Sequence, residues 1–151
     1  MSGTAGEDPE RKAWLAVLAR ASAEEIEARL AEAPPLPPHT RLRGPEIGLV
    51  MVRGRAGGDG APFNLGEMTV ARCSVALAGG AVGHALRAGR DRRAAELSAV
   101  LDAALQDAAL RPVLHAAVIA PLAAAQKARR DAEAERAAAT RVEFLSMVQI
   151  R

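Results

Sequence analysis

The spacing of apolar side chains follows a helical period in the first part of the chain. Between residues 9 and 33 apolar positions recur every three or four residues, which is typical of amphipathic helices. An Asp-Pro pair at 8–9 predicts the start of one helix, and Ser22 with Glu25 forms a capping box for a second. We therefore expect a helical hairpin that ends at the proline-rich segment 34–38.

The middle of the chain has the pattern of β-strands. Residues 40–43 predict a short strand, and residues 47–52 form a short, unbroken run of apolar residues and glycine. Residues 67–77 alternate between two faces, and Gly79-Gly80 is suited to a hairpin turn that leads into a partner strand at 81–88. This pattern predicts an antiparallel sheet of three to four strands.

The last part of the chain returns to the helical period. Asp91 precedes a helix with one apolar stripe, and Pro112 is expected to end that helix. The stripe consists of Leu97, Val100, Leu101, Ala104, Leu105 and Ala108. A second helix is expected from 113 through 140, with a kink at Pro121. The chain thus predicts an α+β fold with an N-terminal helical hairpin, a small antiparallel sheet and C-terminal helices.

Residues 123–140 contain only small or polar side chains, most of them alanine or charged. Ion pairs between Lys127 and Asp131 and between Arg129 and Glu133 are expected to support this helix, which has little apolar surface of its own to bury. We therefore expect residues 123–151, which comprise this helix and the more apolar tail, to face a partner. The opening helix is expected to face a partner as well.

The composition points to one domain with a modest core. The chain has 151 residues, of which 50% are hydrophobic but only 2% aromatic, so the core must be built from small and aliphatic side chains. The prediction is a single domain over 1–151, with residues 1–7 disordered. A core of limited area favours a chain that completes its burial in an assembly.

Charge and cysteine content exclude several classes of protein. The net charge is +2, and a protein so poor in stacking aromatics is not expected to bind nucleic acid. Cys73 is the lone cysteine, which argues for a reducing compartment, and the sequence has no signal peptide and no apolar run of about 20 residues that could span a membrane. We expect a cytoplasmic protein that does not contact a membrane.

The motifs that could carry catalysis are weak. The glycine-rich segment 54–60 lacks the G-K-[ST] ending of a phosphate-binding loop, so it is interpreted as a loop between strands. His39, His84 and His115 do not stand at metal-ligand spacing. The sequence therefore predicts no catalytic residue, no metal site and no cofactor bound by this chain alone.

Arginines cluster where the last strand meets the next helix, at Arg87, Arg90, Arg92 and Arg93. Arg72 lies among apolar strand residues, where an unpaired guanidinium would be costly, so Glu67 or Asp91 is expected to pair with it and tie the sheet to the helix. Two interpretations stay open: structural ion pairs, or an anion surface. If the chain contacts substrate, we expect Arg72, Arg90 and Arg93 to do so.

Several motifs in order resemble one known family. Residues 63–73, FNLGEMTVARC, match F-x-L-G-E-x-T-V-T-R-C, and 89–91 match G-R-D. Residues 46–51 resemble E-x-G-L-V-M, Asp102-Ala103 matches a D-A pair, and 139–148 resemble A-T-R-V-[DE]-F-F-T-M-V. Together they resemble the PhnG family of the bacterial carbon–phosphorus lyase system. The tail departs from it, with FLSM in place of F-F-T-M.

This resemblance implies a role in phosphonate metabolism. It implies an accessory subunit of a core complex with PhnI, PhnH and PhnJ, with PhnL and PhnK as further candidate partners. In that system an alkylphosphonate displaces adenine from ribose C1 of ATP and gives ribose 1-methylphosphonate 5-triphosphate. PhnI carries the nucleoside chemistry, ATP is a co-substrate of the complex, and PhnJ later breaks the carbon–phosphorus bond. Asp102, as a matched position, is then expected to be structural.

Two other classes of function stay open from the residues themselves. One is a homodimeric structural or binding protein without catalysis, with the alanine-rich helix as its dimer seam. The other is a small nucleic-acid-binding protein, against which the scarcity of aromatics argues.

Overall fold

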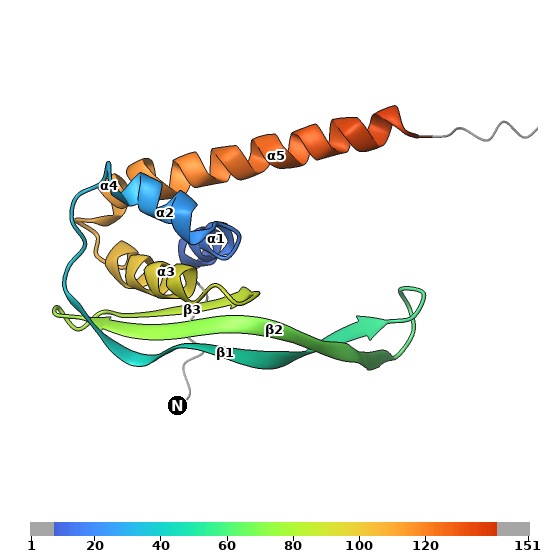
Figure 1. Cartoon of the computed structure of the whole chain (residues 1–151), viewed down its shortest axis with the longest axis horizontal. Coiled ribbons are helices and arrows are strands. Elements are labelled where there is room, and N and C mark those ends of the chain that lie inside the picture. The colour runs from blue at the N-terminus through green and yellow to red at the C-terminus, as the bar shows by residue number, and fades with distance from the viewer. Residues whose placement is uncertain (1–7, 142–151) are drawn as a thin grey trace, which may run out of the picture.

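A computed structural model describes residues 8–141 of the chain as helices stacked on one face of an antiparallel sheet (Figure 1). In chain order the elements are α1 (Pro9–Leu18), α2 (Ala23–Leu30), β1 (His39–Arg55), β2 (Pro62–Leu77), β3 (Val82–Ala88), α3 (Arg92–Leu105), α4 (Arg111–Leu114), the π-helical turn η1 (His115–Ile119) and α5 (Ala120–Ala139). The α+β prediction is confirmed. The predictions for residues 1–7 and for the apolar tail beyond 141 lie outside the described residues.

The N-terminal hairpin forms as the sequence predicts. The side chain of Asp8 accepts a hydrogen bond from the backbone N–H of Glu10 at the start of α1. At the start of α2, Ser22 accepts from the N–H of Glu25, and the Glu25 carboxylate accepts from the N–H of Ser22. Both halves of the capping box are therefore present, and they fix where the chain turns from α1 into α2.

The described residues form three strands in the order β1-β2-β3. The sequence predicted separate strands at 40–43 and 47–52, but β1 is one long strand that passes through Gly44-Pro45. The pairing register between β1 and β2 shifts on both sides of Arg43. These β-bulges accommodate the proline, so the strand continues past it. The glycine-rich segment connects β1 to β2, and Gly80, at φ +90°, closes the turn between β2 and β3.

Helix α3 lies directly against β2 and β3 and is buried on nearly all sides. It begins after Asp91, which accepts a hydrogen bond from the N–H of Ala94. It ends at Leu105, so the prediction that it continues to Pro112 is wrong. Pro112 instead stands in the first turn of α4, where the missing N–H removes no helical hydrogen bond.

The last helical segment runs from α4 through η1 into α5 without a break. The irregularity expected at Pro121 takes the form of the π-helical turn that precedes it. In Figure 1, α5 continues past the other helices, and the far ends of β1 and β2 project in the same direction.

The core lies between the sheet and the helices. Its large members are Trp14, Leu18, Ile26, Leu101, Leu105 and Leu114, packed with many alanines. Small side chains allow α3 to approach β3 so closely that a Cβ on Gly83 would lie 1.9 Å from the carbonyl oxygen of Ala99. Among residues 8–141, no helix is both long and apolar enough to cross a membrane.

Candidate functional site

Asp102 is the centre of a buried polar network between α1, β3 and α3. Its side chain is fully buried, and its two oxygens accept hydrogen bonds from Nε and Nη2 of Arg11 at 3.1 and 2.8 Å. They also accept from Trp14 Nε1 at 3.0 Å and from the backbone N–H of His84 at 2.9 Å. The hydrogen bond to Asp102 raises the pKa of Arg11. One carboxylate thus joins α1, β3 and α3.

A second buried carboxylate, Glu96 on α3, holds the start of β1. Nε and Nη2 of Arg41 donate to its two oxygens at 2.7 and 2.9 Å, and His39 Nε2 lies 3.3 Å from Oε1. The hydrogen bonds from Arg41, and to a smaller extent from His39, lower the pKa of Glu96. Its burial acts in the opposite direction but does not cancel this effect. This pair anchors the long edge strand to the helical layer.

Arg72 points to the face of the sheet that the helices leave uncovered. Its Nε donates to Glu46 Oε1 at 2.6 Å, and Arg43 Nε donates to the same oxygen at 2.7 Å. The hydrogen bonds from Arg72 and Arg43 lower the pKa of Glu46. The expectation that Glu67 or Asp91 pairs with Arg72 is therefore wrong, because the cross-strand register places Glu46 opposite Arg72.

Asp91 and Glu67 have different surroundings. Asp91 caps α3 and also accepts from the backbone N–H of Ala23 at 3.3 Å, which ties the start of α2 to the start of α3. Glu67 is exposed on β2 and has no hydrogen-bond or ion-pair partner within residues 8–141. Of these two acids, the geometry gives only Asp91 contacts that connect elements.

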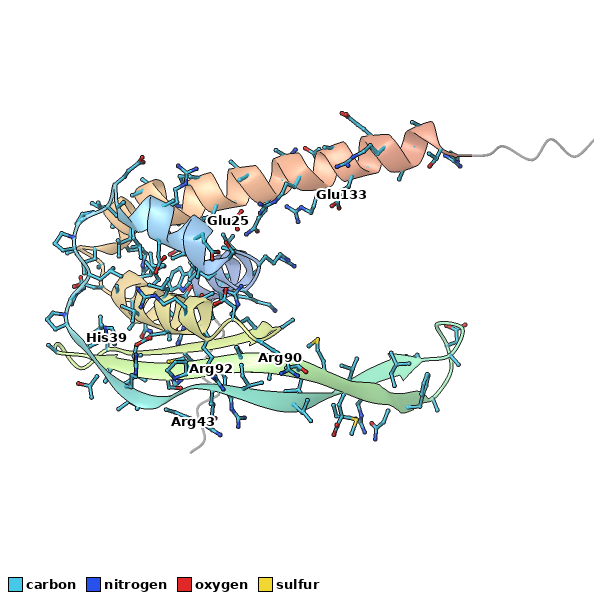
Figure 2. All side chains as sticks on the ribbon, viewed as in Figure 1. Glu25, His39, Arg43, Arg90, Arg92 and Glu133 are labelled. Carbon is cyan, nitrogen blue, oxygen red and sulfur yellow. The ribbon has the colours of Figure 1, made fainter. Side chains whose placement is uncertain are left out.

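The three arginines considered as substrate ligands do not converge. Arg93 pairs with Glu27 of α2 at 2.8 Å on the helical side of the sheet, whereas Arg72 lies on the opposite side. Arg90 is exposed at the junction of β3 and α3 and has no partner in the described part of the chain (Figure 2). The geometry does not bring these side chains to one site, and their contact with substrate stays a prediction.

Within the described residues, the first half of α5 holds this helix to α1 and α2. Gln126 Nε2 donates to the carbonyl of Val17 at 2.9 Å, and Arg129 pairs with Glu25 of α2. The expected pair of Arg129 with Glu133 is therefore wrong, because the α2 carboxylate lies within reach of Arg129; the expected pair of Lys127 with Asp131 is confirmed. From residue 127 to 141 every side chain is exposed, as Figure 2 shows around Glu133.

Besides the exposed part of α5, the chain has a second exposed surface that the sequence did not predict. It consists of residues 49–68, the far ends of β1 and β2 with their connecting loop, and we call it the ribbon arm. Large apolar side chains are exposed there, namely Leu49, Met51, Phe63, Leu65 and Met68. Leu49 is 60% and Leu65 66% exposed. The sequence did carry a signal, because apolar residues on a two-stranded segment with no helix predicted above it have nothing within the chain to cover them.

Cys73, Ser74 and His84 carry the reactive groups of β2 and β3. Burial raises the pKa of the Cys73 thiol, which keeps it protonated and unreactive. Ser74 Oγ lies 2.9 Å from His84 Nδ1, but across the described ranges no carboxylate contacts that imidazole ring to orient it. In the same residues, no three His, Cys, Asp or Glu side chains are grouped so that they could hold a metal ion.

The fold and these surfaces define a class: an α+β chain tied together by buried carboxylates, with two projecting segments left uncovered. A family model for the phosphonate metabolism protein PhnG matches residues 9–149. The chain is also 44% identical over 144 residues to the alpha-D-ribose 1-methylphosphonate 5-triphosphate synthase subunit PhnG of Rhizobium meliloti (strain 1021). That match covers 93% of this chain and 89% of the relative. The chain belongs to the PhnG family, which confirms the resemblance found in its motifs.

Proposed function

We propose that this chain is an accessory subunit of an alpha-D-ribose 1-methylphosphonate 5-triphosphate synthase complex. The observation that carries this proposal is the 44% identity, over most of both chains, to a relative named as a subunit of that synthase. The uncovered ribbon arm and the exposed end of α5 support it, since a subunit is expected to leave surfaces for other chains.

In the proposed reaction an oxygen of the alkylphosphonate attacks C1 of the ribose of ATP. The bond from C1 to the adenine nitrogen breaks, and adenine leaves with a proton. The products are adenine and ribose 1-methylphosphonate 5-triphosphate, so ATP is a co-substrate of the complex. This chain contributes binding surfaces and no cofactor of its own.

The partners proposed for this chain are the lyase subunits PhnI, PhnH and PhnJ, with PhnL and PhnK as further members. In this arrangement PhnI carries the nucleoside chemistry and PhnJ acts later on the carbon–phosphorus bond. The role of this chain is to complete the assembly in which PhnI works.

The ribbon arm is the surface we assign to a partner subunit. By strand alternation and pairing, Leu49 and Met51 lie on the same face as Ile47, which packs against the core, but they extend beyond the helices that cover it. Leu65 lies at the register shift between Val52 and Arg53, where the alternation of β2 is interrupted, and its Cβ is 3.9 Å from the place a Cβ on Gly54 would take. Exposed apolar side chains on a two-stranded ribbon are stabilised when another chain covers them.

Replacing Leu49 and Leu65 together with threonine should weaken assembly without unfolding the chain. Threonine keeps strand propensity and removes apolar area that is exposed in the free chain. The test is a pull-down of the tagged full chain co-expressed with the other lyase subunits, with thermal unfolding of the purified chain measured in parallel. We expect the recovery of the complex to fall about tenfold or more, since two buried leucines contribute about 1.5–3 kcal/mol each.

The matched control is Leu42→Thr, which alters an equally exposed leucine at the other end of β1, away from the ribbon arm. This variant should assemble as the wild type does. Full recovery of the complex with the double variant would contradict the assignment of the ribbon arm. Elution of the wild-type chain alone as a dimer, while the other subunits assemble without it, would favour the homodimeric alternative.

A further inference from the structure

The sheet has two outer strands, β1 and β3, because β2 lies between them (Figure 1). Side chains from α3 and its C-terminal end protect the edge of β3. The backbone N–H of His84 donates to Asp102 at 2.9 Å. The carbonyl of Val82 accepts from Gln106 Nε2 at 2.8 Å. In the described part of the chain, no strand pairs with the outer edge of β1, and no side chain bonds to its backbone at 47–52.

The backbone groups of β1 alternate between β2 and the open side, as they do in any antiparallel sheet. On β2, the carbonyl of Thr69 accepts from the N–H of Gly89, so odd-numbered residues of β2 direct their backbone groups toward β3. Even-numbered residues of β2 therefore face β1, where the register pairs them with the even-numbered residues between 46 and 52. The residues of β1 that direct their N–H and C=O groups outward are then Ile47, Leu49 and Met51.

Residues 47–52, which we call the open edge, lack the features that usually protect an outer strand. Their sequence, IGLVMV, contains no proline and no charged residue, and their pairing with β2 contains no bulge. Such an edge readily pairs with a strand of another chain. The protecting features stand on either side of it, with Pro45 and two register shifts before it and Arg53 and Arg55 after it. An apolar edge between protected flanks is suited to one added strand of limited length.

The flanking charges indicate the chemistry of the strand that would fit. Arg53 and Arg55 are exposed, and neither forms an ion pair within the described residues. Arg55 donates to the carbonyl of Gly60 at 3.2 Å, which leaves its charge uncompensated. Opposite charges on neighbouring strands attract, so an apolar strand with a carboxylate near these two arginines is complementary to the open edge.

A second copy of this chain is less complementary to the open edge. If two copies paired in antiparallel fashion about Leu49, Arg53 and Arg55 of one chain would approach Arg43 of the other. Glu46 lies beside Arg43, but its carboxylate already accepts hydrogen bonds from two arginines of its own chain. Like charges on neighbouring strands are destabilising, which favours a different chain as the partner.

We propose that the open edge of β1 accepts a strand from another subunit, which joins the sheet through backbone hydrogen bonds. The added strand is apolar beside residues 47–52 and acidic near Arg53 and Arg55. A third strand stabilises the ribbon arm, because a two-stranded ribbon is only marginally stable. This proposal rests on the proposed function, which supplies the other subunit, and places the contact in the backbone of β1 in addition to the side chains of the ribbon arm.

The test compares Met51→Pro with Met51→Thr in a pull-down of the tagged full chain co-expressed with the other lyase subunits. Both variants lose the methionine side chain, but only proline removes the outward N–H and places a ring on the edge. Proline is tolerated in an outer strand where the N–H faces solvent. We expect Met51→Pro to recover about tenfold less complex than Met51→Thr, through the loss of one backbone hydrogen bond and the clash of the ring. Equal recovery of the two folded variants would overturn the proposal.

The acidic character of the added strand is tested at Arg53. Arg53→Glu should lower the recovery of the complex further than Arg53→Gln, because the reversed charge repels a carboxylate. Recovery with Arg53→Glu equal to or above that with Arg53→Gln would overturn the assignment of an acidic strand.

If Met51→Pro fails to fold, hydrogen exchange of the wild-type chain carries the test. The amides of Ile47, Leu49 and Met51 should exchange rapidly in the free chain and at least about tenfold more slowly in the complex. If the complex forms and these amides exchange as in the free chain, the open edge is refuted and the proposed function stands. Protection in the isolated chain together with dimer formation would assign the edge to a second copy and overturn the proposal. Failure of the wild-type chain to assemble with the other subunits would refute the proposed function itself.

Discussion

Replacement of Asp102 with alanine is expected to lower the free energy of unfolding by about 3–5 kcal/mol, as is typical when one partner of a buried ion pair is removed. The fully buried carboxylate accepts hydrogen bonds from Arg11, from Trp14 and from the backbone of His84. Without it, the indole N–H and the backbone N–H lose their acceptor, and Arg11 loses its counter-ion. Urea denaturation of the full chain, followed by circular dichroism, measures the effect.

Two further variants test whether the loss of the buried hydrogen bonds causes this loss of stability. Asp102→Asn keeps one acceptor oxygen and should fall between the wild type and Asp102→Ala. Asp131→Ala removes an exposed carboxylate paired with Lys127 on α5 and should cost less than about 0.5 kcal/mol. Equal effects of Asp102→Ala and Asp131→Ala would show that the buried network does not hold α1 to the sheet.

Replacement of Gly83 with alanine should destabilise the chain by about 3 kcal/mol through overpacking. The added Cβ would lie 1.9 Å from the carbonyl oxygen of Ala99, 2.6 Å from the backbone nitrogen of Ala103 and 2.9 Å from the Cβ of Ala103. These atoms belong to the backbone and the first side-chain carbon of α3, so no flexible side chain can yield. Either β3 or the whole of α3 must move, and the close packing of the core is lost.

A second strand glycine provides the control for this effect. A Cβ on Gly66 of β2 would meet no atom within 4 Å, so Gly66→Ala removes glycine's freedom in the unfolded chain without a clash. It should leave the stability unchanged or raise it by about 0.5 kcal/mol. Thermal unfolding of both variants checks the pair, and a Gly83→Ala chain as stable as Gly66→Ala would contradict the close approach of α3 and β3.

The features that sequence reasoning found are local ones. The capping box of Ser22 and Glu25, the start of α3 at Asp91 and the turn at Gly79-Gly80 each depend on residues a few positions apart. Their physical causes lie within one turn of chain, so the sequence alone was enough to predict them.

The features that it missed depend on residues far apart in the chain or on tertiary packing. Arg11 and Asp102 are 91 positions apart, and Arg41 and Glu96 are 55, so neither pair has a local signal. A proline at 112 fits either the end of one helix or the first turn of the next, and tertiary packing decides between the two. Glu46 was missed as the partner of Arg72 because the register between β1 and β2 includes bulges that the sequence does not reveal.

The candidate site was predicted less completely than the fold. The cluster of arginines around the end of β3 was visible in the sequence, but whether its members converge depends on which side of the sheet each one points to. The structure places Arg72 and Arg93 on opposite sides and buries Arg87, which sequence reasoning had named only as part of the cluster. Burial, not spacing, distinguishes Arg87 from the exposed members of the cluster.

If this chain completes a phosphonate ribosyl transferase, as we propose, the reaction should fail when the chain is left out. The lyase subunits are purified with and without this chain and supplied with ATP and methylphosphonate, and the release of adenine is measured by chromatography. We expect adenine release to depend on methylphosphonate and to be lost when this chain is omitted. Equal, methylphosphonate-dependent release of adenine without this chain would contradict the claim.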